Sequence, residues 1–301
     1  MITVAICTRN RRPLLEKAIR SVLAQAGDDL ELLIVDNGST DDTPQLIADL
    51  ASTNARIRYV AELNVGISGA RNTALRQAKG EWVIFLDDDA QALPGWFAGY
   101  QKFFSQLPEP DIAVVGGAVI PEFETPPPYW MNGPQKLNYG EKSFRFTRVI
   151  SLWECNCAYH RETTLAHGAF DVQLGPRGHI VGFREGADLN LRLQSAGHQI
   201  WWLGGAAIQH LVRSEKLTKR QCFRFAFYEG YSIGIMRLKF RSGPDRLAYV
   251  CSRILIGPFH CALNVLVGAL FFPFNKETAA KKLLRATLIA GQLNGTLHGM
   301  R

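Results

Sequence analysis

Three consecutive aspartates are the sharpest chemical feature of this sequence. Asp87, Asp88 and Asp89 directly follow the continuous apolar run WVIFL. Neighbouring carboxylates repel one another, and such a cluster is tolerated where a cation sits among them. Hard oxygen ligands of this kind suit Mg²⁺ or Mn²⁺ bridging a diphosphate. The plainer alternative is a capped helix start with acidic residues in its first turn, ahead of Pro94.

The positions of the strands explain how other polar residues can join these aspartates. Apolar runs at 2–7, 30–35 and 82–86 predict strands, and helical patterns separate them. This rhythm is typical of a parallel sheet with right-handed crossovers. Ligands of such sheets bind outside the carboxyl ends of the strands. We therefore expect Asp36 and the Thr8-Arg9 loop to converge with the aspartates on one crevice.

The remaining periodic segments extend this pattern along the chain. Helices are predicted over residues 13–23, 44–50, 70–78 and 189–196, and further strands over 57–60 and 113–119. Residues 200–203 predict a strand that ends at a Gly204-Gly205 turn, after which 206–209 lead to His210.

Composition narrows the class of protein. The chain has 301 residues, of which 47% are apolar and 20% charged, values that exclude collagen, long disorder and a polytopic membrane protein. Six cysteines without a CxxC pair argue against a disulfide scaffold and against a cysteine-based zinc site. The first residues lack the basic and apolar segments of a signal peptide, so a cytoplasmic location is expected.

Charge divides the chain into two parts. Residues 1–210 hold 19 Lys and Arg against 23 Asp and Glu, whereas residues 211–301 hold 15 against 4. A strongly basic tail suits an anionic surface, either a membrane or a nucleic acid, although a solvated helical face has the same composition. Within the tail, residues 254–275 carry no formal charge. We expect an interfacial or re-entrant helical hairpin there; a buried core helix is the alternative.

Four motifs together resemble those of family 2 glycosyltransferases, which transfer a sugar from a nucleoside diphosphate with inversion. The motifs are ICTRN at the start, IVDNGSTDDT around Asp36, the NxGxxxARN run from Asn64 to Asn72, and the aspartate triplet. The resemblance covers about residues 1–210 and implies a GT-A fold, which is Rossmann-like with a mostly parallel central sheet flanked by helices. Residues 211–301 would form a basic, mainly helical extension that resembles only the membrane-associated members.

The resemblance assigns donor and metal roles to individual residues. Asp89 would be the direct metal ligand, Asp87 would face the ribose or sugar, and His210 would close the metal site. Asn156, in the stretch Cys155-Asn156-Cys157-Ala158, would lie under the donor sugar. The usual family sequence here is G-A-N-x-A, from which this stretch departs. The other implied donor-binding residues are Thr8, Arg9, Asp36, Asn64, Gly66, Arg71 and Asp88.

The catalytic base is where the match departs from the family pattern. The family usually carries Glu-Asp or Glu-Glu twelve and eleven residues before Gly197, and here those positions are Glu185 and Gly186. Asp188 follows, where the family often has a second acid. Glu185 and Asp188 each lie within about one helical turn of the expected position, so both stay candidates for the base.

The implied reaction is metal-dependent and inverting. Mn²⁺ or Mg²⁺ would stabilise the leaving diphosphate, while a carboxylate takes the proton of the acceptor hydroxyl. The expected donor is a nucleoside-diphosphate sugar, with UDP the commonest case in the family. The acceptor would be a glycan or a polyprenyl-linked oligosaccharide in surface-polysaccharide synthesis. The chain would lie peripherally on the inner face of the cytoplasmic membrane, through residues 211–301.

Two other classes of function compete with this interpretation. A nucleotidyltransferase would share the acidic metal site, but it should carry a glycine-rich phosphate loop near the first strand, which is missing around Arg9, Arg11 and Arg12. A non-catalytic nucleotide- or nucleic-acid-binding protein would explain Gly186 and the basic tail. The acidic body of the chain disfavours nucleic acid, and none is expected as a partner.

Overall fold

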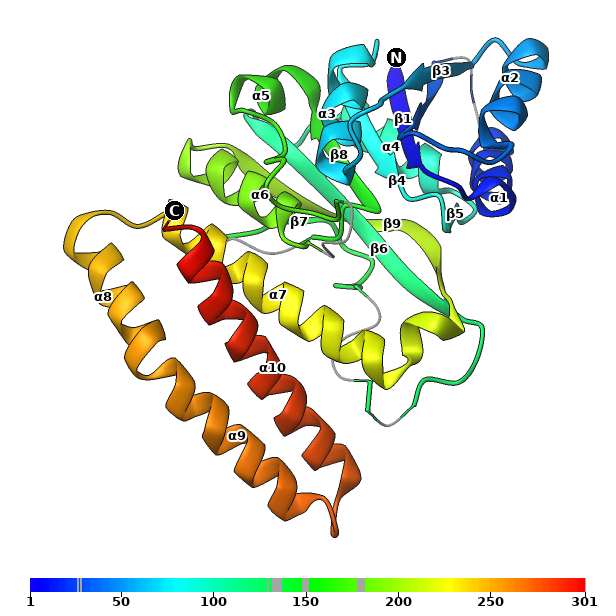
Figure 1. The fold of residues 1–301 in the computed structure, drawn as a ribbon. Helices are drawn as coiled ribbons and strands as arrows, with labels where there is room; N and C mark the ends of the chain where they lie inside the picture. Colours follow the sequence, from blue (N-terminus) through cyan, green and yellow to red (C-terminus); the bar gives the residue numbers. More distant parts are fainter. Residues whose placement is uncertain are drawn as a thin grey trace. The chain divides into compact units, whose positions relative to one another are not determined.

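A parallel block of strands and helices opens the chain, as the apolar periodicity predicts. The computed structural model describes residues 1–25, 27, 29–128, 130–131, 137–147, 152–177 and 182–300. The block consists of β1 (Ile2–Thr8), α1 (Arg12–Leu23), β2 (Leu30–Asp36), α2 (Thr43–Thr53), β3 (Ile57–Ala61), α3 (Ile67–Gln77) and β4 (Trp82–Leu86). The strands pair in the order β3-β2-β1-β4, all parallel (Figure 1).

The strand order reverses between β1 and β4, and this reversal creates the crevice for a ligand. The chain moves outward from β1 to β3 and then returns to the other side of β1 through α3. Right-handed crossovers therefore place α3 on the opposite face of the sheet from α1 and α2. In sheets of this kind ligands bind at the carboxyl ends of the strands where the order reverses. Those ends carry Thr8, Asp36 and Asp87.

The second half of the sheet is antiparallel, which the sequence pattern did not predict. It is built from β5 (Ala90–Ala92), α4 (Trp96–Ser105), β6 (Ile112–Phe123), β7 (Phe144–Arg145), β8 (Asn156–His160), α5 (Arg161–Ala166), α6 (Glu185–Ser195) and β9 (Gln199–Val212). Strand β8 pairs antiparallel with both β4 and β6, and β9 pairs antiparallel with β5 and β7. The described part of the chain thus forms one mixed nine-stranded sheet.

The predicted Gly204-Gly205 turn is wrong, because β9 runs without interruption through both glycines. Gly205 has φ +85°, a left-handed conformation that glycine adopts without steric cost, so it changes the local direction of the strand rather than ending it. The C-terminal part of β9 then pairs with β5, and His210 lies opposite Ala90. This pairing brings the end of β9 beside the aspartate triplet.

The chain divides into two compact units. The first contains Met1–Glu122, Gln135–Gln173 and Glu185–Leu211, which includes most of the sheet and its apolar core. The second contains Phe123–Pro134, Leu174–Arg184 and Val212–Arg301. The change of unit near residue 211 lies next to the predicted boundary at 210, and two short earlier segments belong with the C-terminal region.

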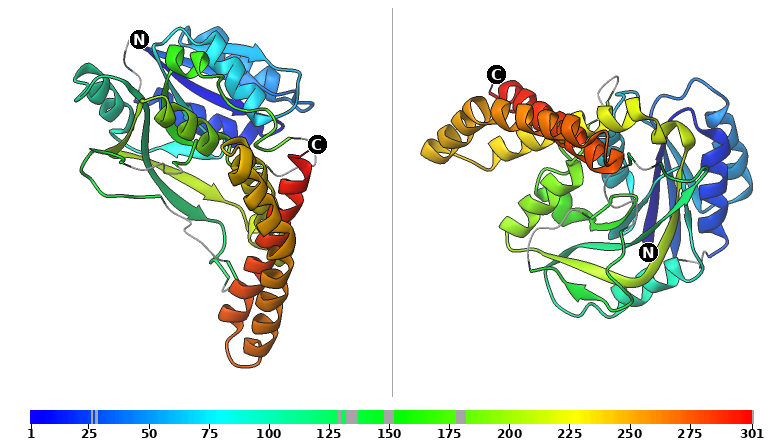
Figure 2. Two further views of the ribbon diagram at one scale, coloured as in Figure 1. Left: turned by 90° about the vertical axis from the view of Figure 1, so that its left-hand side faces the viewer. Right: turned by 90° about the horizontal axis from the view of Figure 1, so that it is seen from below.

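Four long helices dominate the second unit: α7 (Lys219–Lys239), α8 (Gly243–Leu255), α9 (Gly257–Phe271) and α10 (Lys276–His298), after a short 3₁₀ turn η1 (Ser214–Leu217). Helix α10 lies alongside α7 and also contacts α9 (Figure 2). Glycines make the α7–α10 contact close, because a Cβ on Gly291 or Gly295 would fall on the backbone of Phe227 or Tyr231. The glycine spacing near the C-terminus therefore serves helix packing.

Helices α8 and α9 follow one another almost without a break; α8 is amphipathic, and α9 is strongly apolar. The segment Gly243–Phe271 is long and apolar enough to cross a membrane, and only 11% of its most apolar 18-residue window is buried. Many large apolar side chains along it are exposed, among them Leu255, Phe259, Leu266 and Leu270. The alternative of a buried core helix is therefore wrong for this segment.

Candidate active site

The middle aspartate of the triplet points into the protein. Asp88 accepts a hydrogen bond from Thr8 Oγ1 at 2.8 Å, and Arg11 Nη1 lies 2.7 Å from Asp88 Oδ1. Burial raises the pKa of Asp88 to about 6, although the Arg11 guanidinium opposes this shift and the Asp89 charge adds to it. Arg11 also lies 3.1 Å from Asp89 Oδ2. Thr8, Arg11 and Asp88 thereby fix the position of the other two aspartates.

The outer aspartates face two further groups that can bind a cation. Ligand atoms of Asp87, Cys155 and His210 all lie within 4.8 Å of one another. Asp89 Oδ1 is 3.1 Å from His210 Nε2, and the backbone carbonyl of Asp89 accepts a hydrogen bond from the Leu211 N–H at 2.9 Å. The β5–β9 pairing thus holds His210 against the triplet.

The donor set of this cluster fits a hard divalent cation. The two carboxylates suit Mn²⁺ or Mg²⁺, which prefer oxygen ligands, and the imidazole offers one nitrogen ligand beside them. Burial raises the pKa of the Cys155 thiol well above its usual range, and the charge of Asp87 adds to the shift. A thiol sulfur is also a soft ligand, which suits these hard cations less well than a carboxylate oxygen does. Asp87, Asp89 and His210 are therefore the groups that could hold the metal.

The residues expected to bind the nucleoside lie along the same edge of the sheet. Asp36 accepts hydrogen bonds from the Ser39 backbone N–H at 3.0 Å and from Tyr59 Oη at 3.3 Å. Asn37, which follows it, accepts from the Gly66 N–H and donates to the Asn64 carbonyl, so these loops are tied together. Residue exposure differs within the set, since Arg9 and Asn64 are exposed and Thr8 and Asp36 are buried.

Arg71 is the buried cation of the site. Its guanidinium lies 2.8 Å from Glu185 Oε1 and 3.3 Å from Asp87 Oδ1, and it stacks over the rings of Phe85 and Phe170. Burial alone would lower the pKa of Arg71, but the surrounding carboxylates raise it above its usual range. Arg71 therefore stays charged and holds Glu185 in place.

A carboxylate that sequence reasoning missed, Glu154, lies next to this ion pair. A Cβ built on Gly186 would fall on Glu154 Oε1, so the glycine makes room for the glutamate. Burial raises the pKa of Glu154 to about 8, the negative charge of Glu185 adds to this, and Arg71 opposes it. Two sequence signals were present: Glu154 stands at the glycine of the G-A-N-x-A stretch, and glycine stands at the expected acid position 186. Arg11 was also missed, since only its clustering with other arginines had been noted.

Two predicted site residues are held by protein partners. Asp188 is fully buried, and its carboxylate lies 3.0 Å from Arg192 Nε. Asn156 is fully buried as well; its Oδ1 accepts from Trp96 Nε1 and Tyr100 Oη, and its Nδ2 donates to two backbone carbonyls. Asp188 and Asn156 therefore support the site through contacts with other residues of the chain.

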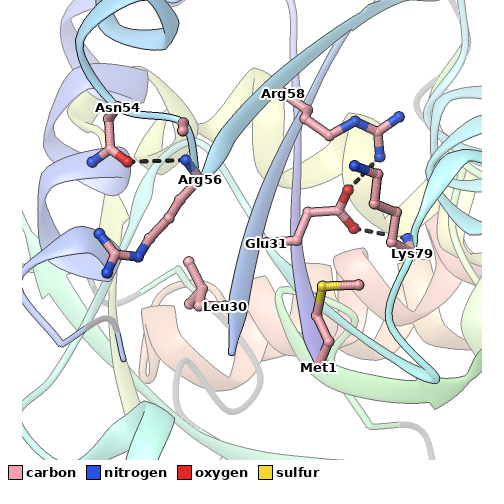
Figure 3. A pocket seen from close by; sticks show the side chains of 8 residues that line it. Met1, Leu30, Glu31, Asn54, Arg56, Arg58 and Lys79 are labelled. Carbon is pink, nitrogen blue, oxygen red and sulfur yellow. Dashed lines mark hydrogen bonds and ion pairs between the residues drawn. The ribbon is translucent and has the colours of Figure 1, made fainter. Parts of the chain in front are cut away.

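A pocket of about 370 Å³ opens at the other edge of the sheet, away from these groups (Figure 3). It lies at the amino ends of β2 and β3, and its charged residues include Glu31, Arg56 and Arg58. Glu31 accepts hydrogen bonds from Thr3 Oγ1 at 2.5 Å, from the Lys79 N–H at 2.8 Å and from Arg58. The carboxylate of Glu31 is therefore well supplied with hydrogen-bond donors within the fold.

Comparison with known proteins agrees with this geometry. Residues 3–165 match the family described as glycosyl transferase family 2, which is more than half of the chain. The chain belongs to glycosyl transferase family 2. This glycosyltransferase is 25% identical over 266 residues to a glucosyl-dolichyl phosphate glucuronosyltransferase of Haloferax volcanii, covering 85% of this chain and 83% of the relative. It is 43% identical over 96 residues to a GalNAc(5)-diNAcBac-PP-undecaprenol beta-1,3-glucosyltransferase of Campylobacter jejuni, but that match covers 31% of each chain.

Solved structures share the fold of the glycosyltransferase. A mannosyltransferase from Pyrobaculum calidifontis, in complex with GDP-Man and Mn²⁺, superposes with a TM-score of 0.65 at 18% identity, over 98% of this chain and 86% of that one. Residues 1–349 of S. aureus TarS superpose with a TM-score of 0.54 at 15% identity, over 96% and 90%. The predicted GT-A fold with a helical C-terminal part is thereby confirmed.

Proposed function

We propose that this glycosyltransferase moves a sugar from a nucleoside-diphosphate sugar to a hydroxyl of a lipid-linked glycan, with inversion at the sugar carbon. The observation that carries the proposal is the convergence of Asp87, Asp89 and His210 at the carboxyl edge of the sheet. Such an edge at a strand-order reversal is where nucleotide ligands bind in α/β sheets.

Different residues of the chain would bind the metal, bind the nucleoside and position the reacting groups. A divalent cation held by Asp87, Asp89 and His210 would stabilise the negative charge of the departing diphosphate. Thr8 and Arg11 keep the aspartate triplet in place through Asp88. Asp36 and the Asn64–Gly66 loop would contact the nucleoside, and Arg71, whose Nη1 lies 2.8 Å from Glu185 Oε1, would hold that carboxylate in position.

The acceptor class is proposed from the relatives. Both relatives named above carry a polyprenyl-linked acceptor in their names, dolichyl phosphate in one and undecaprenol diphosphate in the other. A lipid-linked acceptor also suits a chain whose C-terminal unit exposes an apolar helical segment. UDP is the donor nucleotide we propose, on the family resemblance of the Asp36 motif.

A thermal-shift panel tests the donor site. UDP, GDP, CDP, dTDP and ADP are each added with Mn²⁺, with Mg²⁺ and with EDTA, because a ligand that binds only the folded state raises Tm. We expect a rise with UDP that disappears in EDTA and in Asp89→Ala. Asp49→Ala, on the exposed surface of α2, is the matched control and should keep the shift. A folded chain whose Tm responds to none of the five nucleotides would contradict the proposal.

We also propose that the α8–α9 segment lies in the membrane interface and holds the enzyme on an anionic bilayer. Its apolar stretch is flanked by Arg253 on one side and Lys276 on the other, and residues 211–301 are basic overall. Exposed apolar side chains beside basic residues are the composition of an interfacial helix, since the apolar groups enter the acyl boundary and the cations contact anionic headgroups.

Vesicle co-sedimentation of the full chain tests this placement. We expect binding to phosphatidylglycerol vesicles that weakens with neutral lipid, and a loss of binding in the variant Leu255→Glu with Phe259→Glu and Leu266→Glu. Leu107→Glu, an exposed apolar residue of the first unit, is the control and should bind as the wild type does. Equal binding of the triple variant and the wild type would refute the interfacial segment.

A further inference from the structure

The acidic side chains near the buried Arg71 differ in the ion pairs and hydrogen bonds that they already make. Glu185 is paired with Arg71, and Asp188 is fully buried and paired with Arg192. Asp87 belongs to the cation cluster. Glu154 differs from all three, because in the described part of the chain its carboxylate accepts a hydrogen bond only from its own backbone N–H. It also keeps partial exposure to solvent.

The position of Glu154 is set by Gly186, far along the chain. Gly186 is the second residue of α6 and directly follows Glu185. The space that its side chain would fill is occupied by Glu154 Oε1, so any residue larger than glycine would displace the carboxylate. The Glu154 carboxylate therefore lies where a side chain of residue 186 would begin.

We propose that Glu154 is the catalytic base of this enzyme and that Gly186 is a glycine in order to seat it. The inference rests on the proposed transfer reaction. In that reaction the acceptor O–H proton moves to a Glu154 carboxylate oxygen while the acceptor oxygen forms its bond to the anomeric carbon. The bond from that carbon to the diphosphate oxygen breaks, and its electron pair leaves with the nucleoside diphosphate.

This assignment changes the roles of the two acids predicted from the sequence. Glu185 becomes a positioning residue, since its oxygen is held by Arg71 at 2.8 Å. Asp188 fastens α6 through Arg192, which also donates to the backbone carbonyls of His167 and Ala169. Glu154 is the remaining carboxylate of the group that is free to accept a proton from an incoming hydroxyl.

Isosteric replacement is the first test. Release of nucleoside diphosphate is measured with UDP-glucose, UDP-glucuronate and GDP-mannose, each with and without a dolichyl- or undecaprenyl-phosphate-linked sugar. We expect Glu154→Gln to lower kcat by about 10²- to 10⁴-fold, the usual contribution of a general base, while the Mn²⁺-dependent thermal shift with nucleotide is retained. Glu162→Gln, an exposed glutamate on α5, is the matched control and should keep the wild-type rate.

The second test moves the carboxylate from residue 154 to residue 186. Gly186→Asp alone should be inactive, because its side chain displaces the carboxylate of Glu154. Glu154→Ala combined with Gly186→Asp removes this clash and returns a carboxylate to the same space, so it should recover at least tenfold over Glu154→Ala. This recovery also tests the role of Glu154 if Glu154→Gln fails to fold. If Glu154 had only a structural role, a carboxylate on α6 would not restore the activity.

The outcomes separate this inference from the proposed function. A wild-type rate in Glu154→Gln, or no recovery in the exchanged variant, would overturn the base while leaving the transferase intact. A wild-type chain that neither binds a nucleotide nor releases one from any of the three donors would overturn both.

Discussion

Buried acids lie at both ends of the parallel strands, which we call the amino edge and the carboxyl edge of the sheet. The surroundings of these acids differ between the two edges. At the amino edge, Glu31 is surrounded by donors from Thr3, Lys79 and Arg58. Burial alone would raise the pKa of Glu31, yet these hydrogen bonds together lower it. At the carboxyl edge, Arg71 and Arg11 each face two acids, and the pKa of Glu154 is raised to about 8 by burial and by the charge of Glu185.

This difference distinguishes Glu31, which stabilises the fold, from Glu154, which we propose as the catalytic base. A carboxylate with a full set of donors is stable as an anion and has no reason to exchange a proton. A carboxylate with few donors costs folding free energy when charged, but it can accept a proton near neutral pH. The comparison gives four predictions, in decreasing order of expected effect.

Removal of Arg71 should have the largest effect, because it leaves the buried Glu185 and the partly exposed Asp87 without their ion-pair partner. We expect Arg71→Ala to lower the free energy of unfolding by about 3–5 kcal/mol at pH 8, and by less at pH 5.5, because Glu154, whose pKa is raised to about 8 by burial, is then protonated. Urea denaturation at both pH values measures this. Arg58→Ala at the amino edge, whose side chain is 30% exposed, is the control and should lose less. Equal losses at the two edges would break the comparison.

Removal of a cation ligand should abolish metal-dependent binding while leaving the fold intact. We expect Asp89→Asn to lower kcat/KM by about 10²-fold or more, since the charge that would hold the metal against the diphosphate is lost. Its unfolding midpoint in EDTA should stay close to that of the wild type. Nucleotide titration by calorimetry with and without Mn²⁺ checks this, and an Mn²⁺-dependent affinity equal to wild type would contradict it.

Replacement of Glu31 should affect stability alone. We expect Glu31→Gln to lose about 1–3 kcal/mol of unfolding free energy at pH 7, because charge-assisted hydrogen bonds are weakened. The lowered pKa of Glu31 means that its contribution is present above the ordinary glutamate range and is lost as pH falls through the lowered value. The gap between variant and wild type should therefore narrow in acid, and the transfer rate at 25 °C should not change. A slower rate in folded protein would show that the amino edge reaches the chemistry.

Replacement of Glu154 should have the opposite pH profile and a smaller effect on stability than replacement of Glu31. Because the pKa of Glu154 is raised in the fold, its favourable contribution is present in acid and is lost as pH rises toward 8. We expect Glu154→Gln, measured in EDTA, to become more stable than the wild type by about 1 kcal/mol over this range. A variant that loses stability at pH 8 would place Glu154 with the structural acids.

The sequence by itself determined the parallel core and the place of the aspartates. Apolar runs and helical periodicity are local, so β1, β2 and β4 were predicted to within about a residue, and α1 and α2 to within about three. The polar residues after those strands then had to meet at one edge, because parallel strands share their direction. Asp36, Asp89 and their neighbours could be found in this way.

Only the tertiary structure decided the rest. The antiparallel half depends on pairings between distant segments, and the kink at Gly205 looks like a turn in the sequence although β9 continues through it. The sequence predicts the base at Glu185 or Asp188 on α6, whereas Glu154, the base we propose, reaches the space beside Gly186 from the loop before β8. No local pattern records that a glycine on one element and a glutamate on another fill one volume, because steric complementarity exists only after the chain has folded.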